Sequence, residues 1–391
     1  MKKSMIVAAM LAMVATGANA KSATDSATIA KNKPVFTVVK QNPITSIKDQ
    51  NRSGTCWAYS TLSYFESEIL KHTGKTYDLS EMFVANKTYM DRATMAVRMH
   101  GDVSFSQGGS AYDVLYALQH YGIVPEGAMP APGTLTGDSL ANFGEFFDVM
   151  TPYVEAVAKS NAKKISSAWK SGLQGIIDSY IGKTPEKFTY QGKQYTPQSF
   201  CQSLGLNLDD YVTITSYTHH PMWSKFAVEV QDNWRWPLSY NVPMDDLCKI
   251  IDNAINNGYT VAWGGDVTED GFTRKGLGIA YDVKKVRSMA GTDADHWFKL
   301  SKDEKKEKFD SLGVNAPEVV PTQAMRQEAF DNWETTDDHG MHIYGIAKDQ
   351  NGKEYYMVKN SWGEYGDYKG TWYMTKAFVA YKTMDFMVNK N

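Results

Sequence analysis

The two ends of this chain carry opposite kinds of hydrophobic pattern. Near the start, apolar residues recur at steps of four, three and four, the spacing of one helix face; they are Ala58, Leu62, Phe65 and Ile69. Near the end, Met341 to Ala347 and Glu354 to Lys359 are strand-like, and the Asn351-Gly352 turn between them predicts a hairpin. This order favours an α+β fold in which a helical half and a β-rich half meet at a cleft.

The first twenty residues have the pattern of an export signal. Lys2 and Lys3 are followed by an apolar run from Met5 to Thr16, and Ala18-Asn19-Ala20 supplies a small-x-small cleavage site. The run is too short to span a bilayer stably. No Cys stands directly after it, which disfavours a lipoprotein anchor. We therefore expect a mature chain beginning near Lys21, with no membrane anchor, that works in the periplasm or the medium.

The remaining chain is long enough for one large domain with insertions or for two domains. Hydrophobic residues make up 42% of the full sequence and charged residues 22%, as in ordinary globular proteins. A net charge of -3 gives no reason to expect binding to nucleic acid. We divide the chain into a signal peptide (1–20), an extended arm (21–43), a helical half (44–129), a large, mostly helical insertion (130–257) and a β-rich half (258–391).

Local patterns place further elements along the chain. Apolar periodicity and turn signals predict helices and strands in the middle of the chain and a solvated, charged helix further on. The helices are Ala111 to His120, a stretch around Ala162 to Tyr180, Met244 to Asn256 and Ser301 to Phe309, and the strands are a hairpin at Phe188 to Tyr195 and Gly258 to Trp263.

Cys56 stands where a glycine-containing turn enters the first predicted helix. A helix N-terminus carries unpaired N–H groups and partial positive charge, which favour thiolate and can hold an oxyanion. Gln50 carries an amide that could be a second oxyanion donor. A buried, inert thiol is the plainer interpretation of this cysteine alone. Whether Cys201 and Cys248 pair is left open, but if they do, Cys56 is the odd thiol.

Two segments of the chain resemble the catalytic segments of papain-like cysteine peptidases. Gln50 to Ala58 resembles the nucleophile segment, most closely that of the bleomycin hydrolase and aminopeptidase C branch. Papain has a second cysteine three residues before its nucleophile, where this chain has Ser53. Asp338-His339-Gly340-Met341 and Lys359-Asn360-Ser361-Trp362-Gly363 resemble the family's histidine and asparagine segments, in the family's order. The branch also carries an insertion like that at 130–257.

The resemblance assigns a role to each matching residue. Cys56 is the nucleophile, His339 the base and later general acid, and Asn360 the residue that orients the imidazole. Trp362 shields that contact from water, and we count it with Gly108 and Gly109 among the residues expected at the substrate site. Those two glycines resemble the family's Gly-Gly strip, which lets the cleft approach a substrate backbone closely. A tight turn before a helix explains them equally well.

His342 remains a second candidate for the base because it lies three residues after His339. A metal-dependent hydrolase using these two histidines is a weaker alternative, since no zinc-peptidase glutamate accompanies them. We expect no metal and no organic cofactor.

The expected activity is hydrolysis of peptides or proteins, with aminopeptidase action favoured by the branch. In that branch a C-terminal arm lies in the cleft and blocks it beyond the substrate's N-terminus. No counterpart is found before the end at Met387 to Asn391, although residues 21–43 are another candidate to occupy the cleft. The alternatives are an endopeptidase of the same fold and a catalytically silent homologue that binds peptides.

Overall fold

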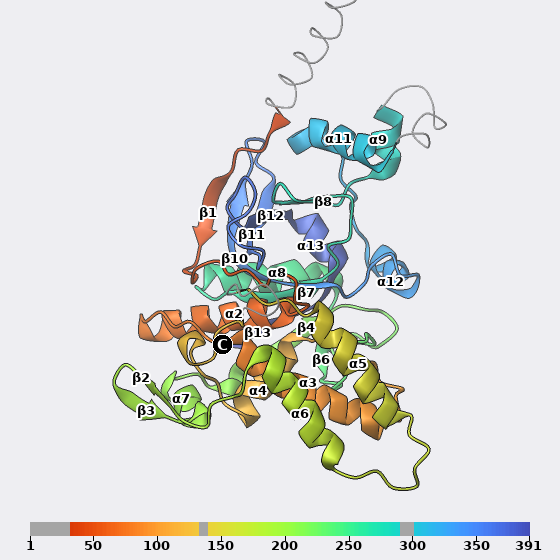
Figure 1. The fold of residues 1–391 in the computed structure, drawn as a ribbon. Helices are drawn as coiled ribbons and strands as arrows, with labels where there is room; N and C mark the ends of the chain where they lie inside the picture. Colours follow the sequence, from red (N-terminus) through yellow and green to blue (C-terminus); the bar gives the residue numbers. More distant parts are fainter. Residues whose placement is uncertain (1–31, 133–139, 290–300) are drawn as a thin grey trace, which may run out of the picture. The chain divides into compact units, whose positions relative to one another are not determined.

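A computed structural model describes residues 32–132, 140–289 and 301–391 (Figure 1). The expected signal peptide and the first part of the expected arm lie outside the described residues. The described chain forms two compact units, and each candidate catalytic residue belongs to the larger, made of 38–279, 320–347 and 354–391. Within the described residues, no helix combines the length and the apolar character needed to cross a membrane.

The larger unit is organised around a long mixed sheet. Within the described residues eleven strands join it, in the order β5-β6-β4-β13-β7-β10-β11-β12-β9-β8, with β1 also paired to β10. The strands are β1 (Thr37–Gln41), β4 (Tyr211–Thr215), β5 (Lys225–Phe226), β6 (Ser239–Asn241), β7 (Val261–Gly265), β8 (Phe272–Thr273), β9 (Leu277–Gly278), β10 (His339–Lys348), β11 (Glu354–Lys359), β12 (Thr371–Thr375) and β13 (Thr383–Asn389).

Strands β10 and β11 lie at the centre of this sheet, next to each other. They are the two strands expected near the C-terminus, and residues 349–353 join them as a hairpin. On its other side, β10 runs antiparallel to β7, with His339 opposite Gly265 and His342 opposite Ala262. Nearly all positions of β10 are buried, because helices cover both faces of this part of the sheet.

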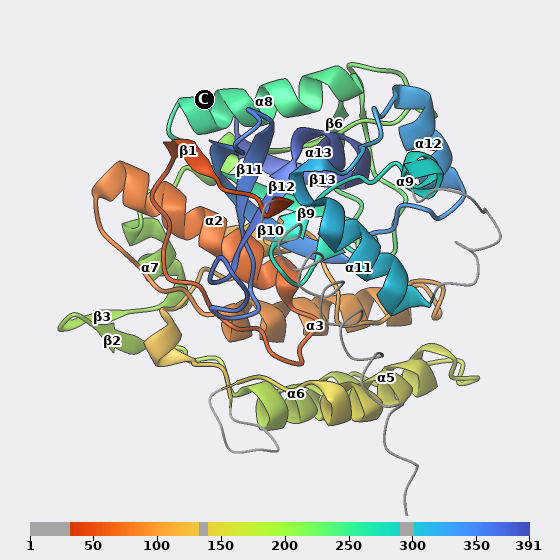
Figure 2. The same cartoon turned by 90° about the horizontal axis from the view of Figure 1, so that it is seen from above.

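The helices that carry the first half of the site pack on this sheet. Helix α2 (Cys56–Thr73) contacts β7, and α4 (Ala111–His120) contacts β7 and β13. Both match the sequence expectation, and α2 ends at Gly74 in the left-handed conformation that glycine adopts without strain. Figure 2 shows α8 (Met244–Asn256) and α3 (Glu81–Arg98) on opposite sides of the sheet. The expected helix at 244–256 is therefore confirmed.

The middle of the chain adds a second helical layer. Helices α5 (Gly144–Ala158) and α6 (Ala168–Ile181) lie side by side and pack on α3, as both ribbon views show. A hairpin of β2 (Phe188–Tyr190) and β3 (Lys193–Tyr195) follows, then α7 (Pro197–Ser203). The sequence predicts α6 and the hairpin but not α5. Many aromatic side chains here pack on one another, which makes them core; examples are Tyr89, Phe143, Phe146 and Phe147.

The remaining helices are short. Helices α12 (Gln323–Asp331) and α13 (Lys376–Lys382) belong to the larger unit. The smaller unit contains α9 (Val283–Met289) and α11 (Lys302–Leu312). Helix α11 includes the charged run that the sequence predicts to be a helix, and Ser301 caps it by accepting from the Glu304 N–H.

Candidate active site

Cys56 is the first residue of α2, and hydrogen bonds to Gln107 hold its neighbours. Gly54 donates its backbone N–H to Gln107 Oε1 over 2.7 Å, and the Trp57 indole donates to Gln107 O over 3.0 Å. The Cys56 side chain is half-buried and faces a cavity of about 250 Å³, which His339 also lines. The turn before α2 thus fixes the thiol at the wall of a substrate-sized hollow.

The thiol is protonated in this environment. The pKa of Cys56 is raised to about 12, mainly because burial removes the sulfur from bulk water and to a smaller extent because the carboxylates of Asp337 and Asp232 lie nearby. Hydrogen bonds from the backbone N–H groups of Gly340 and Trp57 act in the opposite direction but are weaker. The Trp57 N–H at the start of α2 therefore favours thiolate, as expected of a helix N-terminus, but burial of the sulfur outweighs it. A base is needed to take the proton.

His339 and Asn360 are joined by a direct hydrogen bond. They stand at the start of β10 and just after the end of β11, and these strands are neighbours in the sheet. His339 Nε2 lies 2.8 Å from Asn360 Oδ1, and Oδ1 also accepts from the Ser361 backbone N–H over 2.8 Å. That second bond fixes the orientation of the Asn360 amide, so His339 Nε2 is the donor. Its Nδ1 then keeps a free lone pair.

The histidine is a neutral imidazole. Burial lowers the pKa of His339 to about 4, although its bond to Asn360 raises it. The Trp362 ring lies over the imidazole, with the two ring centroids 4.9 Å apart. A neutral imidazole that is held at Nε2 and covered by an indole can accept a proton only at Nδ1.

Strand β10 passes very close to the first turn of α2. A Cβ on Gly340 would come within 2.7 Å of Ser60 Oγ and 3.3 Å of the Cys56 carbonyl oxygen. A larger residue would push β10 away from α2. The glycine after His339 therefore lets the strand bring this histidine to the cavity that Cys56 lines.

Gln50 bridges the turn before α2 and the segment after β11. Its Nε2 donates to the Ser53 carbonyl over 2.8 Å, its Oε1 accepts from Ser361 Oγ over 2.6 Å, and its backbone N–H donates to Ser361 O. An amide NH₂ has two hydrogens, so the bond to Ser53 leaves one for another acceptor. Gln50 is buried, and it is not among the residues that line the cavity at Cys56.

The residues expected at the substrate site have different surroundings. Gly108 and Gly109 line the cavity, whereas Trp362 is not among its lining residues. A Cβ on Gly108 would lie 1.8 Å from the Asp232 carboxylate, and one on Gly109 would lie 2.8 Å from the Trp57 ring. Both positions therefore need glycine because of the protein's own side chains.

His342 occupies a place that does not suit the base. Its Nδ1 lies 2.9 Å from Ser63 Oγ, and Ser63 is seven residues further along α2 than Cys56, about 10 Å at 1.5 Å per residue. Burial holds the pKa of His342 well below its usual value. Between the two histidines, this geometry favours His339. The other two cysteines are free thiols, Cys201 near Leu118 O and Cys248 near Lys376 O.

Four carboxylates line the same cavity, and sequence reasoning did not single them out; they are Asp232, Asp337, Asp338 and Asp385. Asp232 forms an ion pair with Arg92 at 3.0 Å, and Asp338 accepts from the Val267 N–H over 2.9 Å. Within the described residues, neither Asp337 nor Asp385 has a basic partner in an ion pair. Of these four, only Asp337 and Asp338 have a signal in the sequence, which is their position directly before His339.

The environment of the two carboxyls without an ion pair, Asp337 and Asp385, disfavours their charged forms. Burial, and the nearby charges of Asp232, Asp385 and Asp338, hold the pKa of Asp337 well above its usual range. Burial raises the pKa of Asp385 to about 6, and a hydrogen bond from Ser239 only partly offsets this. A positively charged group entering the cavity would relieve both effects.

Comparison with known proteins identifies the class. The fold is that of the papain-like cysteine peptidases: the crystal structure of PepW from Lactobacillus rhamnosis HN001 matches with a TM-score of 0.68 and 19% identity, covering 96% of this chain and 89% of that one. The chain belongs to the Peptidase C1-like family, whose model matches residues 2–312. It is a cysteine-type peptidase.

Curated relatives of this chain include bacterial aminopeptidases. Aminopeptidase G of Lactobacillus delbrueckii subsp. lactis is 23% identical over 385 residues, covering 89% of this chain and 82% of that protein. Aminopeptidase E of Lactobacillus helveticus is also 23% identical, covering 88% and 81%. These relatives confirm the resemblance to the aminopeptidase C branch.

Proposed function

We propose that this peptidase is an aminopeptidase that uses Cys56, His339, Asn360 and Gln50. The observation that carries the proposal is the cavity itself. The candidate nucleophile and base line this cavity together with Asp337 and Asp385, which form no ion pair within the described residues. The aminopeptidase relatives support the same activity.

The proposed reaction has two halves. His339 Nδ1 takes the Cys56 proton as the sulfur attacks the carbonyl carbon, and the carbonyl oxygen becomes an oxyanion. The free hydrogen of the Gln50 amide and the Cys56 backbone N–H hold that oxyanion. The C–N bond then breaks, and the leaving amine takes the proton from His339. A water molecule, deprotonated by His339, hydrolyses the thioester and regenerates the thiol.

The carboxylates suit the amino terminus of a substrate. An aminopeptidase must bind a peptide whose protonated α-amino group lies one residue from the bond that breaks. Asp337 and Asp385 present two unpaired carboxyls to the cavity that Cys56 lines. An ammonium group held there would gain charge-assisted hydrogen bonds and would lower the raised pKa values of both carboxyls.

Asp337→Asn should therefore lower kcat/KM for peptides with a free amino terminus by about 10- to 100-fold, the value of a hydrogen bond to a charged group. The loss should fall mainly on KM, and N-acetylated peptides should be affected much less. Asp270→Asn, at an exposed carboxylate, is the matched control. Equal losses for free and acetylated peptides would contradict amino-terminal recognition by Asp337.

Gln50→Ala should lower kcat by about 10²- to 10³-fold with little change in KM, because an oxyanion donor acts in the transition state. Steady-state kinetics on an aminoacyl amide substrate would measure the split. A melting curve controls for the lost bonds to Ser53 and Ser361. A wild-type kcat in a folded Gln50→Ala protein would remove Gln50 from the mechanism.

Digestion of a peptide library, with mass-spectrometric mapping of the cuts, tests the proposed function. We expect cuts one residue from the amino terminus, repeated stepwise. Cuts at internal bonds would show an endopeptidase, and binding without any cuts would show a silent peptide-binding homologue.

We also propose that the protein is exported, with residues 1–20 removed. The basic start, the apolar run and the Ala18-Asn19-Ala20 site support this. Amino-terminal sequencing of protein isolated from cells should find Lys21 first. A mature chain that retains Met1 in the cytoplasm would refute export.

A further inference from the structure

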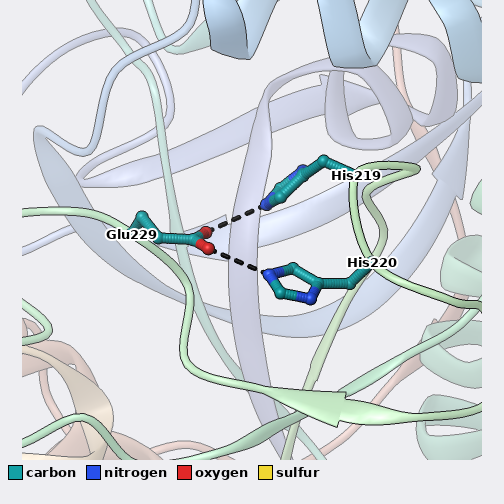
Figure 3. Close-up of side chains that lie close together, drawn as sticks. All are labelled: His219, His220 and Glu229. Carbon is teal, nitrogen blue, oxygen red and sulfur yellow. Dashed lines mark hydrogen bonds and ion pairs between the residues drawn. The ribbon is translucent and has the colours of Figure 1, made fainter.

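Two adjacent histidines and one glutamate converge away from the candidate catalytic residues. His219 and His220 follow β4, and Glu229 follows β5 (Figure 3). Figure 3 shows both imidazoles pointing at one carboxylate. His219 Nε2 lies 3.0 Å from Glu229 Oε2, and His220 Nε2 lies 3.0 Å from Glu229 Oε1. One ligand atom from each residue lies within 4.8 Å of the others.

Neighbouring rings hold both imidazoles in these positions. Phe330 stacks on His219, with the ring planes 12° apart, and Phe226 stacks on His220 at 4.2 Å and 21°. Side chains that are fixed by packing lose little rotamer entropy when they bind a ligand.

A hydrogen-bonding partner lies behind His219. The Gln327 amide contacts Nδ1, with Oε1 at 3.3 Å and Nε2 at 3.0 Å. This amide is itself held, because Thr218 N–H donates to its Oε1 and its Nε2 donates to Asp331. A histidine that binds a metal through Nε2 donates its Nδ1–H to an acceptor, and Gln327 Oε1 is the atom of this amide that can accept it.

We propose that His219, His220 and Glu229 bind a zinc ion. The ligands would be the two imidazole Nε2 atoms and one carboxylate oxygen, with a water molecule in the fourth position. Tetrahedral zinc with bonds near 2.0 Å places its ligand atoms about 3.3 Å apart. The two 3.0 Å separations run to different oxygens of Glu229, and the three ligand atoms lie within 4.8 Å of one another, so the side chains would move to bring both nitrogens and one oxygen to that spacing.

The position of Glu229 gives the ion a structural role. Glu229 lines a second cavity, of about 740 Å³, together with Asp232 and Asp337. Those two aspartates also line the catalytic cavity. Zinc would link Glu229 to His219 and His220 in the turn after β4. This link would restrict the movement of the segment after Glu229, in which Asp232 is three residues further along the chain. The ion would stabilise the wall between the two cavities and take no part in the reaction.

Equilibrium dialysis of the untagged full chain against zinc chloride, with elemental analysis, tests the site. Cys56→Ala is used as the parent protein, so that the thiol at the candidate active site cannot bind the ion. We expect one zinc per chain at micromolar concentration. Glu229→Gln should weaken binding at least tenfold, and His219→Ala with His220→Ala should remove it.

Glu328→Gln, at an exposed carboxylate on α12, is the matched control and should bind as the parent does. Zinc should also raise the melting temperature of the parent but not that of the double histidine variant. The Glu229→Gln result decides the question if the double variant does not fold. No binding at 100-fold higher zinc, or equal binding by the parent and Glu229→Gln, would overturn the proposal.

Discussion

Cys56→Ala should abolish peptide hydrolysis, with kcat/KM falling on the order of 10⁶-fold, as when an enzyme loses its nucleophile. Alanine cannot form the thioester. The substitution removes one half-buried atom, so the fold should remain. Kinetics on an aminoacyl amide and a melting curve would measure both effects.

Cys248→Ala is the matched control for that loss. Cys248 is also a free thiol, and it lies on α8 near the Lys376 carbonyl. This variant should keep wild-type kinetics, and iodoacetamide should inactivate it as it inactivates the wild type. More than about one hundredth of wild-type activity in Cys56→Ala would contradict the role of Cys56, because the expected loss is far larger.

His339→Ala should lower kcat/KM by about 10³- to 10⁵-fold at neutral pH. With a pKa of about 12, only about one Cys56 thiol in 10⁵ is ionised at pH 7 when no base is present. As long as the pH stays below that pKa, each increase of one pH unit raises the thiolate fraction tenfold. The residual activity of His339→Ala should therefore rise about tenfold per unit between pH 7 and pH 10.

His342→Gln separates the two candidate bases. His342 is bonded to Ser63 and buried, so this variant should lose some stability and keep most of its kcat. A large kcat loss in His342→Gln, with activity kept in His339→Ala, would reverse the assignment. If the residual activity of His339→Ala did not depend on pH, another group would have to take the thiol proton.

The parts of the site that sequence reasoning finds have strong local signals. Cys56 combines a glycine turn, the start of an apolar helix and a family motif, and α2 begins at Cys56 as predicted. His339 begins β10 and Asn360 follows β11, and a short turn joins these two strands. Pairing of neighbouring strands brings such residues together without any long-range information.

The parts that it misses depend on distant contacts. The sequence does not show that β13, the last strand, lies between β4 and β7, and this order brings Asp385 to the cavity. Asp232 reaches the same cavity from a loop after β5. The protonation of Cys56 is a similar case, because the helix N-terminus is a local feature whereas burial of the sulfur depends on the whole fold.

Trapping the covalent intermediate tests the central claim most directly. The protein would be mixed with an aminoacyl ester, quenched in acid within the first turnover, digested and analysed by mass spectrometry. The mechanism predicts an aminoacyl group on the peptide that contains Cys56, and no adduct in Cys56→Ala. Continued turnover after complete alkylation of Cys56, with no acyl adduct at this residue, would contradict it.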